Sequence, residues 1–165
     1  MDIPAFSINA SAKATVNPDD PFAVGSYTIG NSSSNATIST VDQLFTIDAT
    51  DVTGTASIDL QNGLQGGSTG GTIAGGDGKD PDGNSVNLSE IMAFHLRNTG
   101  LTVVKITGGS FVGADQMIIG DVEVHPGGEV LISAPTGSAF TNQEIDVYDP
   151  ALGSCSFELM VVGKI

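Results

Sequence analysis

The chain has no tryptophan, one cysteine and only five lysine or arginine residues in a length of 165. The single cysteine, Cys155, excludes an intrachain disulfide. The five basic residues stand against nineteen acidic ones, giving a formal net charge of −14, and they are spread along the chain. Because nucleic acids and anionic membranes are bound by clustered Lys and Arg, the composition predicts neither nucleic acid nor membrane as a partner.

Long apolar runs are also missing. No stretch approaches the roughly 20 residues that a membrane-spanning helix needs. The first residues, MDIPAFSINASAKATV, lack the basic segment followed by an apolar segment that marks a secretory signal. We therefore expect a protein made in a cytoplasm without a secretion address, which can still leave the cell as part of a larger particle.

Short alternating apolar runs, closed by turn residues, dominate the rest of the chain. Residues Gln43–Val52 (QLFTIDATDV) and Thr55–Gln61 (TASIDLQ) alternate with a period of two, the spacing of a half-buried strand. From Ile91 to Ile165 apolar runs are repeatedly closed by Asn, Gly, Pro or Asp. The 22 glycines are then turns, and the pattern predicts an all-β fold, an antiparallel β-sandwich or jelly-roll-like barrel.

Two segments depart from this alternation. Residues 1–35 are polar and broken by prolines, which predicts an extended N-terminal arm ahead of a single domain at 36–165. Residues 61–85 are Gly-rich and predict a surface loop. Apolar residues in a polar arm suggest docking, so we expect an interaction site at Phe6, Ile8, Phe22, Val24, Tyr27 and Ile29. The alternative is that these residues belong to ordinary strands of the same domain.

The acidic stretch Asp77–Asn84 (DGKDPDGN) is the one local arrangement with the character of a metal site. Asp80, Asp82 and Asn84 at alternate positions resemble part of an oxygen-ligand calcium loop, but the closing glutamate is not at the usual spacing. Pro and Gly also make DPDG a strong plain turn. We favour the turn and keep a divalent cation at Asp80, Asp82 and Asn84 as the alternative; no cofactor is predicted.

Catalytic chemistry has no local signature in this sequence. The two histidines, His95 and His125, occur in strand-like runs, and no nucleophile motif or phosphate-binding loop is present. Cys155 also lies in a strand-like run, where a small buried side chain is expected. The sequence therefore predicts a protein that is not an enzyme.

The C-terminal half carries a series of turn motifs: EIMAFHLRNTG, VVKITGG, DVEVHPGGEVLISAP and DVYDPALGSCSFELMVVG. This series, from about Asp82 to Gly163, resembles a family of small tailed-phage structural (virion) proteins. The resemblance implies a non-enzymatic protein of the virion, made in the host cytoplasm. It implies no catalytic residues.

Within that class, the resemblance favours a head decoration (cement) protein that assembles as a homotrimer on the major capsid protein. The alternative is a tail- or fibre-associated binding module that recognises a glycan or host surface through the loop at 61–85. Sugar sites usually present exposed aromatic rings, and the chain has no Trp and two Tyr. A hydrolase is the least favoured interpretation, since neither a nucleophile nor a metal signature is present.

Overall fold

A computed structural model describes residues 6–15, 28–38, 43–67, 69–112 and 121–165. These residues form strands, turns and loops with no helix, so the described part of the chain contains none that could span a bilayer. The all-β prediction is confirmed. The ten strands are β1 (Phe6–Thr15), β2 (Thr28–Ile38), β3 (Gln43–Asp59), β4 (Leu64–Gly66), β5 (Thr69–Gly75), β6 (Glu90–Asn98), β7 (Val104–Val112), β8 (Val122–Val124), β9 (Glu129–Tyr148) and β10 (Ser154–Lys164).

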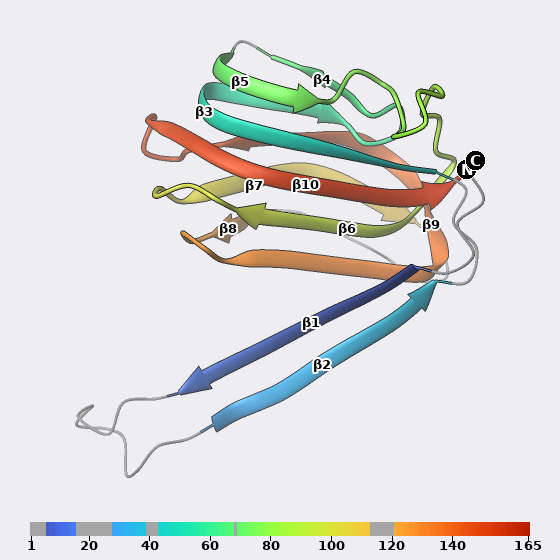
Figure 1. The fold of residues 1–165 in the computed structure, drawn as a ribbon, viewed down its shortest axis with the longest axis horizontal. Helices are drawn as coiled ribbons and strands as arrows, with labels where there is room; N and C mark the ends of the chain where they lie inside the picture. Colours follow the sequence, from blue (N-terminus) through green and yellow to red (C-terminus); the bar gives the residue numbers. More distant parts are fainter. Residues whose placement is uncertain (1–5, 16–27, 39–42, 68, 113–120) are drawn as a thin grey trace.

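The strands form two separate sheets, both antiparallel (Figure 1). β1 and β2 pair only with each other, as a two-stranded hairpin. The other eight strands form one sheet in the order β4-β3-β10-β6-β9-β7-β8, with β5 paired to β3. Neighbours in this sheet are often distant in the sequence: β10 lies between β3 and β6.

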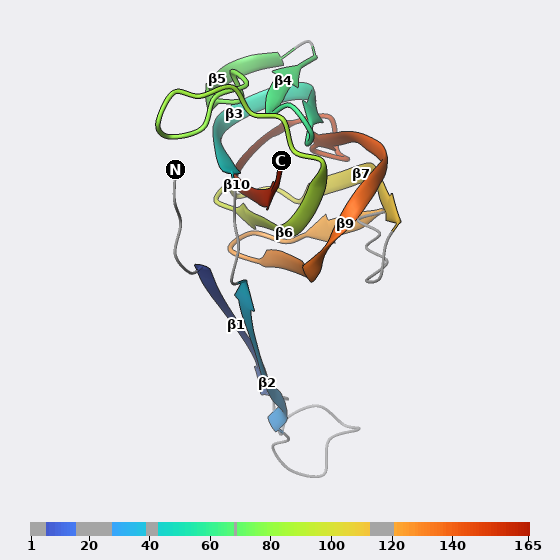
Figure 2. The same ribbon diagram turned by 90° about the vertical axis from the view of Figure 1, so that its right-hand side faces the viewer.

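Two long strands close the larger sheet into a nearly complete barrel. The first part of β3 pairs with β10 and β5, and its last part, Thr55–Asp59, pairs with β9. The first part of β9 pairs with β6, and its last part lies between β3 and β7. β3 and β9 thus pass from one face of the barrel to the other, as the turned view in Figure 2 shows. Such strands form the corners where two packed sheets are joined.

The alternation read from the sequence places one side of each strand in the core. Phe45, Ile47 and Ala49 of β3 are buried, whereas Thr46 and Asp48 between them are exposed. Three phenylalanines, Phe45, Phe94 and Phe157, are the largest fully buried side chains among the described residues. Each stabilises the barrel by up to about 3 kcal/mol relative to an exposed position.

The Gly-rich segment at 61–85 contains more regular structure than the surface loop expected for it. It includes the short strands β4 and β5, both paired to β3. Glycine permits this pairing because its backbone can approach closely: a Cβ at Gly71 or Gly75 would collide with backbone carbonyls of β3, and both have positive φ. The local composition predicts a loop because it contains no information on the distant strand with which this segment pairs.

Candidate functional site

The N-terminal residues proposed as an interaction site fall partly in the hairpin. Phe6 and Ile8 lie in β1, where the register places them opposite Ile38 and Ala36 of β2. Ile29 lies in β2, opposite Ala14. Phe22, Val24 and Tyr27 lie outside the described residues. The structure thus brings three of the six into one two-stranded ladder.

The acidic loop folds around one carboxylate. Oδ1 of Asp80 accepts hydrogen bonds from the backbone N–H groups of Asp82 (3.0 Å) and Asn84 (2.8 Å), and Oδ2 accepts one from Nδ2 of Asn84 (3.1 Å). The amide of Asn84 contributes most to holding the pKa of Asp80 below its usual value. Both oxygens of Asp80 therefore bond within a turn. No group of three His, Cys, Asp or Glu side chains that could hold a metal ion occurs in the described residues.

The histidines and the cysteine lie apart from one another. His95 is a partly exposed residue of β6, and His125 is exposed in the turn after β8. Cys155 is 1% exposed, as predicted, and burial, with a smaller effect of Asp149, raises the pKa of its thiol to about 11. The thiol is protonated at neutral pH, so it is a packing side chain rather than a nucleophile there.

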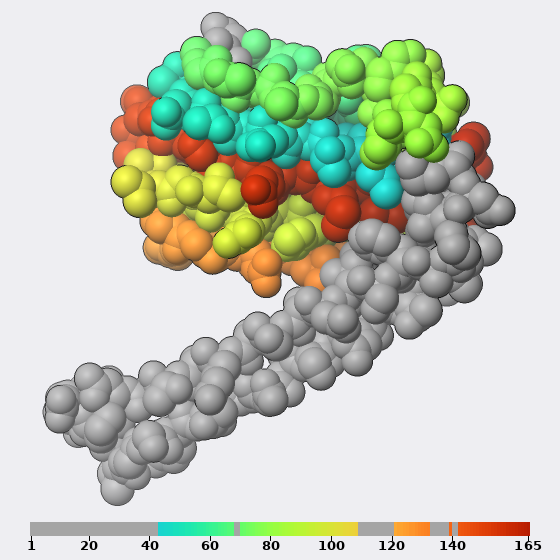
Figure 3. All heavy atoms as spheres, in the orientation of Figure 1, coloured from blue at the N-terminus to red at the C-terminus, as the bar shows by residue number. Residues whose placement is uncertain are grey.

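The side of β3, β10, β6 and β9 that points away from the barrel core carries an ordered pattern of side chains. We call this side the outer face. In an antiparallel sheet, directly opposite residues point to the same side. The register therefore arranges the side chains of this face in rows that run across the four strands, and we call each row a rung. In Figure 3 these four strands follow one another as teal, red, yellow-green and orange bands across the visible side of the barrel. In the order β3, β10, β6, β9, the first rung is Asp48, Glu158, Arg97 and Glu129, and the second is Thr46, Met160, His95 and Leu131. The third rung is Leu44, Val162, Ala93 and position 133 of β9. The fourth rung is Lys164, Glu90 and Ala139, from β10, β6 and β9, and has no described β3 member.

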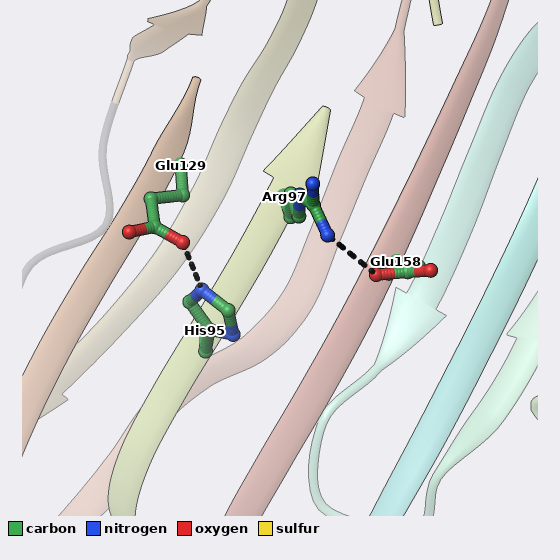
Figure 4. Close-up of polar contacts among 4 residues, drawn as sticks. All are labelled: His95, Arg97, Glu129 and Glu158. Atoms are coloured by element: carbon green, nitrogen blue, oxygen red, sulfur yellow. Dashed lines mark hydrogen bonds and ion pairs between the residues drawn. The ribbon is translucent and has the colours of Figure 1, made fainter. Parts of the chain in front are cut away.

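The two end rungs are charged and internally paired. Arg97 Nη1 lies 4.0 Å from Oε2 of Glu158, and Lys164 Nζ lies 3.2 Å from Oε2 of Glu90. Nε2 of His95, in the second rung, lies 3.1 Å from Oε2 of Glu129, in the first rung (Figure 4). The Arg97–Glu158 and Lys164–Glu90 ion pairs and the His95–Glu129 contact thus lie on one face of a chain whose formal net charge is −14.

The apolar residues of the two central rungs, together with Met92, form a second, smaller apolar cluster outside the barrel core. Met92, Ala93 and Val162 are at most 1% exposed, with Leu44, Leu131 and Met160 partly buried around them. Met92 is accommodated by a β-bulge, since the register shifts by one residue between Val162 and Gly163 where β10 pairs with β6. A recess of about 320 Å³ opens beside the cluster, lined by Thr46, Asp48, His95, Glu158 and Met160 together with Ile47 and Leu159.

A second, polar groove of about 600 Å³ lies where β3 meets β9. It is lined by Ser57, Asp59, Gly66, Gly67, Asn142, Gln143 and Glu144. At its side, Oγ of Ser57 donates to Oδ1 of Asp146 at 2.5 Å. Two of its glycines belong to the 61–85 segment that the sequence singled out. The groove presents hydroxyl, amide and carboxylate groups but no aromatic ring among its lining residues.

Sequence reasoning did not identify the outer face. Its members come from segments up to about 120 positions apart, and only the register of β10 between β3 and β6 aligns them. One signal was available: the outward positions of SCSFELMVVGK include Met160 and Val162, where a solvent-facing strand usually carries polar residues.

Comparison of the chain with protein families, with curated proteins and with solved structures finds no match.

Proposed function

We propose that this chain is a non-enzymatic structural protein of a tailed-phage virion, a capsid decoration (cement) protein that stabilises the head as a homo-oligomer. The proposed partners are further copies of itself, as a homotrimer, and the major capsid protein. The turn motifs of the C-terminal half suggest this class. The observation that carries it is the presence of a nearly closed barrel and a separate two-stranded hairpin in one chain.

A decoration protein needs a rigid body and a means of reaching neighbouring subunits. The barrel supplies the body, because β3 and β9 join its two sides. The hairpin supplies reach: ten residues of β1 at about 3.3 Å per residue give a ladder of about 33 Å. Phe22, Val24 and Tyr27 belong to the segment between the two hairpin strands, and we assign them the contact with the major capsid protein.

The proposal is tested in the phage that encodes the chain. Heads and tails are purified separately, and the protein is located by mass spectrometry. Heads lacking it should release DNA at a lower temperature, and adding the purified full chain should restore the wild-type value. A full-length variant with Phe22→Ser and Tyr27→Ser should bind heads more weakly, with Leu101→Ser, a change at a 95% exposed residue, as control. Presence on tails alone, or heads with unchanged stability, would reject the proposal.

The polar groove favours a second candidate, a tail- or fibre-associated module that binds a glycan or host surface. Its hydroxyl, amide and carboxylate groups match the hydrogen-bonding groups of a sugar. A glycan array with the full chain tests this candidate, and Asn142→Ala with Glu144→Ala should remove any binding. Retained binding in that variant would exclude the groove as the site.

A further inference from the structure

The charges at the ends of β10 and β6, the two central strands of the outer face, alternate in sign. On β10, Glu158 lies in the first rung and Lys164 in the last; on β6, Arg97 lies in the first rung and Glu90 in the last. Each strand therefore has one anionic and one cationic end, in opposite order. This arrangement complements itself after a half-turn.

From this pattern we propose that two copies of the chain pair through their outer faces about a two-fold axis. With the axis parallel to the strands, between β10 and β6, Glu158 faces Arg97 of the second copy, and Lys164 faces Glu90 of the second copy. With the axis across the strands, Glu158 faces Lys164 of the second copy, and Arg97 faces its Glu90. Either axis places opposite charges together at the ends of β10 and β6, and each contact occurs twice in such an isologous pair. The axis parallel to the strands also places Asp48 against Glu129 of the second copy, two like charges, so the axis across the strands is favoured.

A second copy fits this face better than a partner of another kind for two reasons. The chain carries a net charge of −14, so two copies repel unless their contact places cations against anions. Two of the described cations, Arg97 and Lys164, lie on this face together with His95, whereas Lys79 and Lys105 lie elsewhere. Between the charged rungs, Leu44, Leu131 and Met160 supply an apolar centre, and the neighbouring recess leaves room for side chains of the second copy. An apolar centre with a charged rim is the usual anatomy of a protein interface.

This inference deepens the self-association in the proposed function. A trimer ring is built from head-to-tail contacts, whereas a two-fold contact links one copy or ring to another. The contact expected here therefore doubles the smallest assembly.

Sedimentation velocity of the full chain across a range of concentrations measures this association. The wild-type protein should approach twice the mass of its smallest species. Glu158→Lys should raise the dissociation constant at least tenfold, because the introduced lysine would face a cation about either axis. Glu123→Lys, at an exposed position of β8 outside the outer face, makes the same change of net charge. It should leave pairing unchanged or strengthen it, because it lowers the general repulsion.

Two double variants complete the test. Glu158→Lys with Arg97→Glu restores opposite charges about the axis parallel to the strands, and Glu158→Lys with Lys164→Glu restores them about the axis across the strands. Recovery in one of them, with an unchanged far-UV circular dichroism spectrum, supports pairing and identifies the axis. A single species of constant mass in the wild type, or recovery in neither double variant, overturns the proposal. A wild-type protein of constant mass would mean that another segment or another partner covers the outer face. Location on phage heads is measured independently, so loss of pairing does not bear on the proposed function.

Discussion

Asn98, at the end of β6, is the most deeply buried polar residue of the described chain. Its side chain is fully buried, and Nδ2 donates to the backbone carbonyls of Thr102 and Val124, both at 2.7 Å. Oδ1 accepts from the backbone N–H of Gly100 at 2.9 Å. One side chain thus fixes the turn that follows β6 to the end of β8.

Replacement of Asn98 by alanine should lower the free energy of unfolding by about 3 kcal/mol. Three hydrogen bonds are lost, each with a net value of about 0.5–1.5 kcal/mol, and their backbone partners lose a bonding group that water cannot easily replace. Asn98→Asp keeps the shape but points acceptor oxygens at two carbonyls. It should therefore be at least as destabilising at neutral pH.

Urea unfolding followed by far-UV circular dichroism provides the measurement, since the chain has no tryptophan. Asn142→Ala is the matched control: this exposed asparagine accepts one bond, from the backbone N–H of Glu144 at 3.1 Å. It should cost less than about 1 kcal/mol. An Asn98→Ala protein within about 1 kcal/mol of wild type, or as stable as the control, would refute the reasoning.

Three further perturbations follow from the backbone and the buried thiol. Leu152 is 94% exposed with a φ of 62°, so Leu152→Gly should raise the free energy of unfolding by about 1 kcal/mol by relieving left-handed strain; an unchanged urea midpoint would contradict this. Gly75→Ala should cost about 2–4 kcal/mol because its Cβ meets a backbone carbonyl of β3, whereas Gly83→Ala, also at positive φ but with open space around it, should cost about 1 kcal/mol; equal losses would show that the collision is relieved elsewhere. An unfolded thiol loses its proton near pH 9.0, whereas burial raises the pKa of Cys155 in the fold to about 11, so the folded state binds more protons between these pH values. The free energy of unfolding of the wild type should therefore fall more steeply than that of Cys155→Ala as the pH rises from 9 to 11. Parallel pH profiles of the two proteins would contradict this effect of the buried thiol.

The fold class was predictable because alternation survives in single strands. The run from Gln43 to Val52 read as a half-buried strand, and Phe45 and Ile47 are indeed in the core. The turn motifs also coincide with the limits of strands: β6 ends at the Asn of Asn-Thr-Gly, and β9 begins directly after Pro-Gly-Gly. These features depend on neighbours in the chain, which a sequence displays directly.

Pairing between distant strands was not predictable in this way. The composition of the Gly-rich segment predicts a loop, whereas in the structure β5 of this segment pairs with β3, where the missing Cβ of Gly75 permits the contact. The outer face was missed for the same reason, since Glu158 and Arg97 become neighbours only through the register of β10. The side chains of the acidic loop were recognised from the sequence, but not that Asp80 would bond to its own turn.

The position of β10 has a consequence for synthesis of the protein. This strand is made after the other nine described strands, yet it lies between β3 and β6 and pairs with residues up to 120 positions away, as Gly163 does with Gln43. A growing chain therefore exposes the apolar edges of β3 and β6 until β10 has left the ribosome. Closing such long loops late makes folding slow and leaves intermediates open to aggregation. We expect the nascent chain to need protection by chaperones, and a chain truncated before β10 to be degraded rather than to accumulate as a smaller domain.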